Sequence, residues 1–452
     1  MKNASNDLFS MINVISIIYF LLIFIICSLQ VSQVTQTAQA AIDSYNKLFP
    51  YHFTYCTTSK YETKGKGVSG GNGGHALLYI KGACKDKNSP IPLLSLCHRE
   101  NTLDNSNAGA AISVNWDFKN VAFNVVDNKD FVLNGILTGE LANKKLDNKI
   151  WNSTIDEAIK QNIFAGIETH DNNLKLGKNC SNKEMRLRKL ISRSLLSDFA
   201  VTYGKTAYCV NIPTDKETTV EMINHLNSIQ KSFRPKLFEP KTSLKDHDFK
   251  WKHIYLNCGH IPYNAFANLG YWDSRPEHSL LIHHLLKPVF PGNLFIDLVN
   301  LANNLELDVY KLYKNKKILT YFLEHKRLPI SHGSTVDVFP IKENNEKFKD
   351  NKNFVIVPLK QAFTLANSKQ EDFSKFISEK KYLDLTSNLK FFKEKYSNAL
   401  TKIEENKKQK NFGKHSSKHL DEYKNFLNLF EQYLIEQLKD VNSKIDSYSV
   451  NK

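Results

Sequence analysis

The chain has 452 residues, with 61 Lys and Arg against 46 Asp and Glu, and a formal net charge of +15 at pH 7. At roughly 150 residues per domain, this length predicts two or three domains. Hydrophobic residues are 41% of the chain and aromatic residues 11%, which excludes a wholly disordered protein. Seven cysteines are too few for a disulfide scaffold. No long apolar run follows the first 30 residues, which excludes a multi-span membrane protein.

The positive charge comes mostly from lysine, and lysines usually lie on solvated faces of a protein. The alternative is attraction to an anionic surface, such as lipid headgroups or an acidic envelope polymer. The lysines are not interleaved with stacking aromatic residues in any short motif, so nucleic-acid binding is not expected.

The amino terminus is typical of an export signal. Residues 11–29 are apolar and uncharged, Lys2 precedes them, and residues 38–40 have the small-x-small form of a cleavage site. The sequence therefore predicts a signal peptide over residues 1–40 and an exported protein of the periplasm, the cell surface or the medium. The alternative is an uncleaved anchor that tethers the chain to a membrane, because the apolar stretch is near the length that spans a bilayer.

Export implies an oxidising compartment in which disulfides form. Six cysteines follow the predicted cleavage site, and if one is a free catalytic thiol the other five cannot all pair. Cys84 and Cys97 are spaced for a short bridge, although connectivity does not follow from sequence.

The pattern of residues 41–280 predicts an α+β domain with strands grouped early and helices between and after them. A glycine-dense loop at 64–74 separates the first two strands. The predicted strands are His52–Glu62, His75–Lys81, Ala111–Trp116, Val121–Val126, Phe131–Leu133, Thr206–Ile212 and Lys250–Leu256. The predicted helices are Ile150–Ala165, Lys183–Phe199, Lys216–Phe233 and a short helix that ends at Gly270.

The character of the chain changes near residues 276–290, where we place a domain boundary. Residues 281–370 are expected to form a mainly helical extension, and residues 371–452 a Lys/Glu-rich helical hairpin or coiled tail. That tail is a candidate surface for an envelope protein partner, and the alternative is a solvated helical tail. The predicted elements are helices Leu294–Leu307, Val309–His325, Phe373–Lys410 and His419–Ile445, and a strand Phe354–Pro358.

Residues 65–70 match the spacing G-x-G-x-x-G of dinucleotide sites. Such a site needs the glycines between a strand and a helix, so that the pyrophosphate meets the helix N-terminus. Here the glycines lead into a strand, and no G-K-[ST] follows. We therefore expect no nucleotide and no other cofactor.

Cys258 follows a predicted strand and lies at the start of a predicted helix. Unpaired backbone N–H groups and the helix dipole favour the thiolate there, and the same groups can hold an oxyanion. Asn257 is a residue type suited to the N-cap and is expected to help bind substrate. Pro262 would disturb a helix that began at Cys258, so the alternative is a helix that starts at Pro262 and leaves Cys258 in the turn before it. The alternative is a structural or bridged cysteine. The expected buried stripe consists of Ile261, Ala265, Phe266 and Leu269.

His75 opens a predicted strand beside the glycine loop, where an imidazole can reach a cleft. A cysteine nucleophile needs a base within hydrogen-bond reach and a group that orients the base. Asn115 is the first candidate for that third member and His98 the alternative. Gly73 and Gly74 would let a substrate backbone approach closely. Taken alone, a histidine at a strand start is more often structural.

His260 is two residues from Cys258, so on a regular helix it would point away from the thiol. It is expected to pack or to bond the backbone, with a catalytic role as the lesser alternative. No metal site is expected, because H-E-x-x-H and paired C-x-x-C motifs are absent and the adjacent His283 and His284 would lie on different helix faces.

The segment from Gly73 to Ile80 and the later Asn257–His260 segment together resemble the circularly permuted papain-like superfamily. This superfamily includes NlpC-like hydrolases, the lecithin–retinol acyltransferase group and the amino-terminal periplasmic domain of lacto-N-biosidase-chaperone-type proteins. The resemblance covers about residues 50–275. It implies Cys258 as nucleophile, His75 as base, a polar third member from a following strand, and an antiparallel sheet with helical insertions.

The sequence thus predicts an exported, envelope-associated cysteine hydrolase or acyltransferase that cleaves an amide or ester bond. The acyl donor would be a peptide, a protein or a lipid. The rival interpretation is a non-catalytic periplasmic or cell-surface binding protein on the same scaffold.

Overall fold

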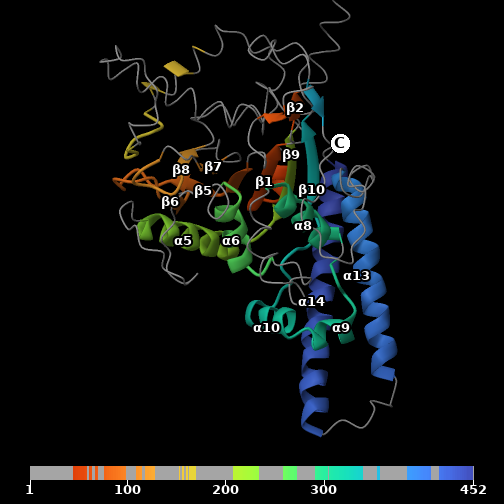
Figure 1. The fold of residues 1–452 in the computed structure, drawn as a ribbon. Coiled ribbons are helices and arrows are strands. Elements are labelled where there is room, and N and C mark those ends of the chain that lie inside the picture. Colours follow the sequence, from red (N-terminus) through yellow and green to blue (C-terminus); the bar gives the residue numbers. More distant parts are fainter. Residues whose placement is uncertain are drawn as a thin grey trace, which may run out of the picture.

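The computed structural model shows an α+β protein with an antiparallel sheet and a helical carboxy-terminal region (Figure 1). The residues it describes are 44–58, 61–63, 67–69, 76–97, 108–114, 118–127, 152, 155–156, 159–160, 162–168, 207–233, 258–271, 291–303, 305–339, 354–356, 384–408 and 417–450. The predicted signal peptide at 1–40 therefore lies outside the described residues, as do the elements predicted at 131–133, 183–199 and 250–256.

The main sheet has six strands, and each neighbouring pair is antiparallel. The central strand β1 pairs on one side with β4, which follows it in sequence, and on the other with β9, which lies some 150 residues later. The order across the sheet is β10 (Thr335–Phe339), β9 (Ala207–Pro213), β1 (His52–Thr58), β4 (Ala76–Lys81), β7 (Gly109–Ser113) and β8 (Asn124–Asp127).

Two smaller sheets accompany the main one. One contains β11 (Phe354–Ile356), β2 (Tyr61–Thr63) and β3 (Gly67–Ser69), and the other contains β5 (Ala83–Lys85) and β6 (Leu94–Leu96). The single strand predicted at His52–Glu62 is therefore wrong in extent, because β1 and β2 belong to different sheets. The glycine-dense segment 64–74, predicted as a loop, contains the short strand β3.

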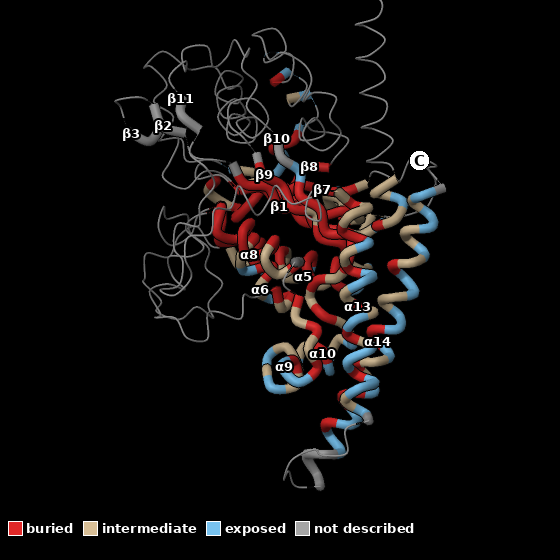
Figure 2. The backbone as a smooth tube through the Cα atoms, turned by 90° about the vertical axis from the view of Figure 1, so that its right-hand side faces the viewer, coloured by how far each residue is buried: buried red, intermediate tan, exposed pale blue. Residues whose placement is uncertain are grey.

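Three helices cover one face of the main sheet, as Figure 2 shows. They are α5 (Lys216–Ser232), α6 (His260–Asn268) and α8 (Pro291–Asn303). Alternate residues of β1 point toward them: Phe53 and Tyr55 are fully buried, and their rings contact Phe266 of α6 at centroid distances of 5.8 and 6.3 Å. Burial of these aromatic rings holds α6, and therefore the segment before it, against the centre of the sheet.

Two disulfides tie this part of the chain together. Cys56 of β1 and Cys209 of β9 are direct partners in the strand register and are bridged. Cys84 and Cys97 are bridged as their spacing suggested.

The carboxy-terminal helices form a second core. They are α9 (Val309–Lys314), α10 (Lys316–His325), α13 (Leu385–Lys408) and α14 (Ser417–Val450). The long helices α13 and α14 lie side by side (Figure 1). Phe430 of α14 is fully buried and meets Phe322 of α10 edge to face, at 5.6 Å between ring centroids. None of the helices in the described parts of the chain combines the length and the apolar character needed to cross a bilayer.

The structure differs from the sequence prediction in two further places. The single helix predicted at Val309–His325 is divided at Asn315, whose side chain accepts a hydrogen bond from the Ile318 N–H and caps α10. Strand β10 was not predicted. Both β10 and α8 follow the domain boundary expected near 276–290. However, β10 joins the main sheet, and α8 packs in the same core as β1. The first core therefore contains residues from both sides of that boundary.

Candidate functional site

Cys258 lies in a turn directly before α6, and its thiol is free and buried. Its side chain packs in the core that joins α6 to the main sheet. The other four cysteines among the described residues are all bridged. Among the described cysteines, Cys258 is therefore the one free thiol, and it lies at a helix start.

Helix α6 begins two residues after the thiol, at His260, with Gly259 as its N-cap. The sequence placed the cap at Asn257, and that placement is wrong; Asn257 itself lies outside the described residues. Pro262 falls in the first turn, where the missing N–H would have no intrahelical partner, so it does not disturb the helix. Among the described residues no side chain caps α6, because the N-cap is Gly259. The positive end of the helix dipole is therefore directed toward the Cys258 turn.

The expected buried stripe of α6 is confirmed. Ile261, Ala265 and Phe266 are fully buried, and Leu269 is 1% exposed. This stripe fixes α6 on β1, so the position of the thiol is set by packing and not by a loose loop.

Tyr55 of β1 is buried in the same core as the Cys258 side chain. Burial, and after it the nearby Cys258 sulfur, raise the pKa of Tyr55 well above its usual range. The Tyr55 hydroxyl donates to the carbonyl oxygen of Pro291 at 2.9 Å, at the first residue of α8. Tyr55 therefore joins α8 to β1 and stands as a neutral phenol beside the sulfur.

His260 is 7% exposed, and burial lowers its pKa to about 4. It is thus a neutral imidazole at pH 7. A buried neutral histidine in the first turn of α6 agrees with the packing role that the sequence indicated, while its lesser catalytic alternative stays a prediction.

The remaining predicted site residues lie outside the described residues. They are the base His75, the third-member candidates Asn115 and His98, and the binding residues Gly73, Gly74 and Asn257. Ala76, the first residue of β4, pairs with Thr57 of the central strand. Within the described parts of the chain, no group of three or more His, Cys, Asp or Glu side chains is arranged to hold a metal ion.

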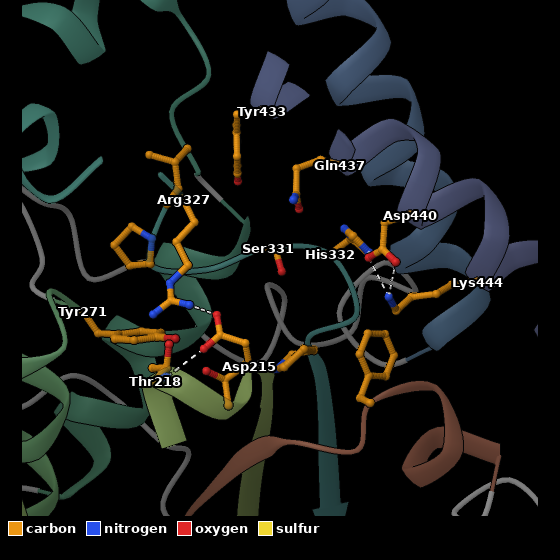
Figure 3. A pocket seen from close by; sticks show the side chains of 15 residues that line it. Asp215, Thr218, Tyr271, Arg327, Ser331, His332, Tyr433, Gln437, Asp440 and Lys444 are labelled. Atoms are coloured by element: carbon orange, nitrogen blue, oxygen red, sulfur yellow. Dashed lines mark hydrogen bonds and ion pairs between the residues drawn. The ribbon is translucent and has the colours of Figure 1, made fainter. Parts of the chain in front are cut away.

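A second candidate site is a pocket of about 180 Å³ where α14 meets the first core (Figure 3). Its lining includes the N-cap of α5, Tyr271 after α6, the segment 327–332 that leads to β10, and one face of α14. Asp215 caps α5 through a 2.7 Å hydrogen bond from the Thr218 N–H and also pairs with Arg327.

A second charged cluster lies at the other side of this pocket. His332 donates from Nε2 to the Asp440 carboxylate at 2.9 Å, and Lys444 pairs with the same carboxylate at 2.5 Å. Burial lowers the pKa of His332 and outweighs the hydrogen bond to Asp440, so the ring is neutral. Burial raises the pKa of Asp440, but the hydrogen bonds from His332 and Lys444 outweigh burial and bring that pKa to about 2.

Ser331, His332 and Asp440 do not form a hydrolytic triad. The Nε2 atom of His332 is bonded to Asp440, and its Nδ1 atom lies 3.5 Å from the Tyr396 hydroxyl. Neither ring nitrogen is left to take a proton from the Ser331 hydroxyl, as a triad base must. The described geometry of this pocket therefore does not support a serine hydrolase site.

Sequence reasoning missed this pocket, because its residues come from separate parts of the chain and carry no local motif. One signal was present: Asp215 directly precedes a helical pattern, which is typical of an N-cap. Nothing in the sequence joins His332 to Asp440, 108 residues later.

Comparison with protein-family models, with curated proteins and with solved structures found no match to this chain.

Proposed function

We propose that the protein is an exported, envelope-associated cysteine hydrolase or acyltransferase with Cys258 as its nucleophile. The observation that carries the proposal is the free Cys258 thiol at the start of α6, in a chain whose other described cysteines are bridged. A thiol kept reduced among disulfides needs a reason, and nucleophilic catalysis supplies one.

The proposed reaction has two steps. The His75 imidazole removes the Cys258 proton, and the thiolate attacks an amide or ester carbonyl. As the C–N or C–O bond breaks, the imidazolium returns its proton to the leaving amine or alcohol, which leaves a thioester on Cys258. Water or an acceptor amine then attacks that thioester, and the thiol is restored. Peptide N–H groups at the start of α6 would stabilise the oxyanion.

The fold that accompanies this proposal is the permuted papain-like one. It is supported by order in the chain and by packing: the strand after His75, β4, pairs with the central strand, and the helix after Cys258 packs against that strand. Asn115 is proposed to orient the base, with His98 as the alternative. A peptide, a protein or a lipid is the proposed acyl donor, and the positive net charge of +15 suits an acidic envelope substrate.

Replacing Cys258 by Ala is expected to abolish the activity, and His75→Ala to reduce it at least about 100-fold, as for loss of a general base. The measurement is turnover of a panel of p-nitrophenyl esters and wall-derived peptides. Iodoacetamide labelling followed by peptide mass spectrometry checks the same thiol, which should be alkylated in the native protein.

The matched control is the double variant Cys84→Ala/Cys97→Ala, which removes two sulfurs of the same chain without touching α6. It should keep both turnover and labelling at Cys258. Unchanged turnover in Cys258→Ala would refute the proposed role of this thiol.

One observation favours the rival interpretation, a non-catalytic binding protein on the same scaffold. Cys258 is only 6% exposed, and the neighbouring Tyr55 hydroxyl is bonded to α8. A structural thiol would have such surroundings. Failure of iodoacetamide to label the native protein, together with no turnover on any substrate of the panel, would favour this alternative.

A further inference from the structure

The pocket between α14 and the first core contains two buried hydroxyl groups whose protons have no acceptor among the described residues. They belong to Thr218 and Tyr433. These residues are only 1% and 4% exposed, and both line the pocket (Figure 3). A buried hydroxyl without a partner costs free energy unless a ligand or water satisfies it.

The groups around the Tyr433 hydroxyl show which hydrogen-bond partner it lacks. Burial raises the pKa of the Tyr433 hydroxyl, while a hydrogen bond from the Leu328 backbone N–H and, more weakly, the charge of Arg327 lower it. Both of these groups are donors, so the phenol's own proton still lacks an acceptor. In Figure 3 the Tyr433 hydroxyl and the Gln437 amide are directed from α14 toward Ser331 and Arg327, across the hollow of the pocket.

The charged groups of the pocket are already matched. Arg327 pairs with Asp215, and Lys444 pairs with Asp440, which also accepts from the neutral His332. A charged ligand would have to break one of these pairs or add a like charge beside it, and both changes are unfavourable. The groups that remain are hydroxyls and an amide, which both donate and accept hydrogen bonds.

The size and the walls of the pocket restrict the ligand further. The volume of about 180 Å³ is below the roughly 300–1,000 Å³ of sites for drug-sized ligands. The rings of Phe49, Tyr271 and Tyr433 contribute apolar surface to the lining. A small ring that carries hydroxyls on its edge and C–H groups on its faces matches both features.

We propose that this pocket binds one small, uncharged, polyhydroxylated molecule of the size of a single sugar residue. The Tyr433 and Thr218 hydroxyls, with the Gln437 amide, would bond the ligand's hydroxyl groups. The site is separate from Cys258: Tyr271 follows the end of α6, whereas Cys258 precedes its start. The nine residues of α6 span about 14 Å between them. The inference therefore stands without the proposed thiol chemistry.

The test is isothermal titration calorimetry of the full exported chain with N-acetylglucosamine and D-glucose, and with inorganic phosphate as the charged probe. We expect saturable binding of at least one of the sugars with a stoichiometry of one, and no binding of phosphate. The variants Tyr433→Phe and Thr218→Val should each weaken the sugar at least 10-fold. Because each substitution keeps the shape of the side chain, both variants should fold, with melting temperatures close to that of the unmodified protein.

The matched control is Tyr423→Phe, which removes a phenol oxygen from the same helix at a position outside the pocket. It should bind the sugar as the unmodified protein does. Three results would overturn the inference: phosphate binding without sugar binding, no saturation by either sugar up to 50 mM, or sugar binding that Tyr433→Phe and Thr218→Val leave unchanged.

Discussion

Acidification from pH 7 to pH 4.5 is expected to lower the free energy of unfolding by about 5 kcal/mol, because two buried histidines stay neutral in the folded protein. Burial lowers the pKa of His52 to about 4, against a smaller opposing effect of its hydrogen bond to the Phe49 carbonyl. Burial likewise lowers the pKa of His260 to about 4.

The sign of the effect follows from which state takes up protons first. In the unfolded chain both histidines become protonated as the pH falls through their ordinary value of 6.5, whereas in the folded chain they do so only near pH 4. Between these values the unfolded state binds more protons. The contribution of the two histidines to stability is therefore fully present above about pH 6.5 and is lost as the pH falls toward 4. His332 acts in the same direction. Asp440, with its pKa of about 2, adds a further loss below about pH 4.

Urea unfolding at a series of pH values measures this dependence. Between pH 7 and 4.5, the free energy of unfolding of the His52→Gln variant should fall by only about half as much as that of the unmodified protein. His260→Gln should behave likewise. Each variant is compared with itself at pH 8, where histidine is neutral in both states, so that any destabilisation independent of pH cancels. An undiminished loss in both variants would show that other groups cause the acid sensitivity.

Removing the Cys56–Cys209 bridge is expected to destabilise the protein by about 5 kcal/mol, more than removing Cys84–Cys97. In the chain-entropy model a disulfide restricts the unfolded chain more when it closes a longer loop. The first bridge has a sequence separation of 153 residues and the second of 13, which corresponds to about 5 and about 3 kcal/mol.

Paired substitutions compare the two bridges directly. Cys56→Ala/Cys209→Ala and Cys84→Ala/Cys97→Ala each remove two sulfurs, and guanidinium unfolding of the two variants gives their relative cost. The Cys56→Ala/Cys209→Ala variant loses the covalent link between β1 and β9 and should therefore unfold at the lower denaturant concentration. Equal midpoints, or the reverse order, would contradict the loop-length argument.

Local periodicity was sufficient for the elements whose pattern is long or strong. Strand β4, strand β9 and helix α5 match the predicted segments within one residue at each end, because alternation and helical spacing are properties of adjacent residues. The α6 stripe was also found in this way. The exact start of α6 was not predicted. Asn257 is the better residue type for an N-cap, but the N-cap is Gly259, because tertiary packing can override local propensity.

Features that depend on distant residues were not predictable. β10 is five residues long, and its place beside β9 is set by pairing over 124 or more residues. The pocket at α14 needs Asp215, Arg327 and Asp440 to line one hollow, and this follows only from the packing of the second core on the first. Cys258 was found because a thiol near a helix start has chemical meaning in sequence alone.

The bridge between β1 and β9 has a consequence for how the protein responds to proteolysis. Every residue from 57 to 208 lies on a covalent loop closed by Cys56 and Cys209. A protease that cut this loop at one site would produce two polypeptides that stay joined and adjacent in the main sheet. Such a nicked molecule would run as one species on a non-reducing gel and as two after reduction.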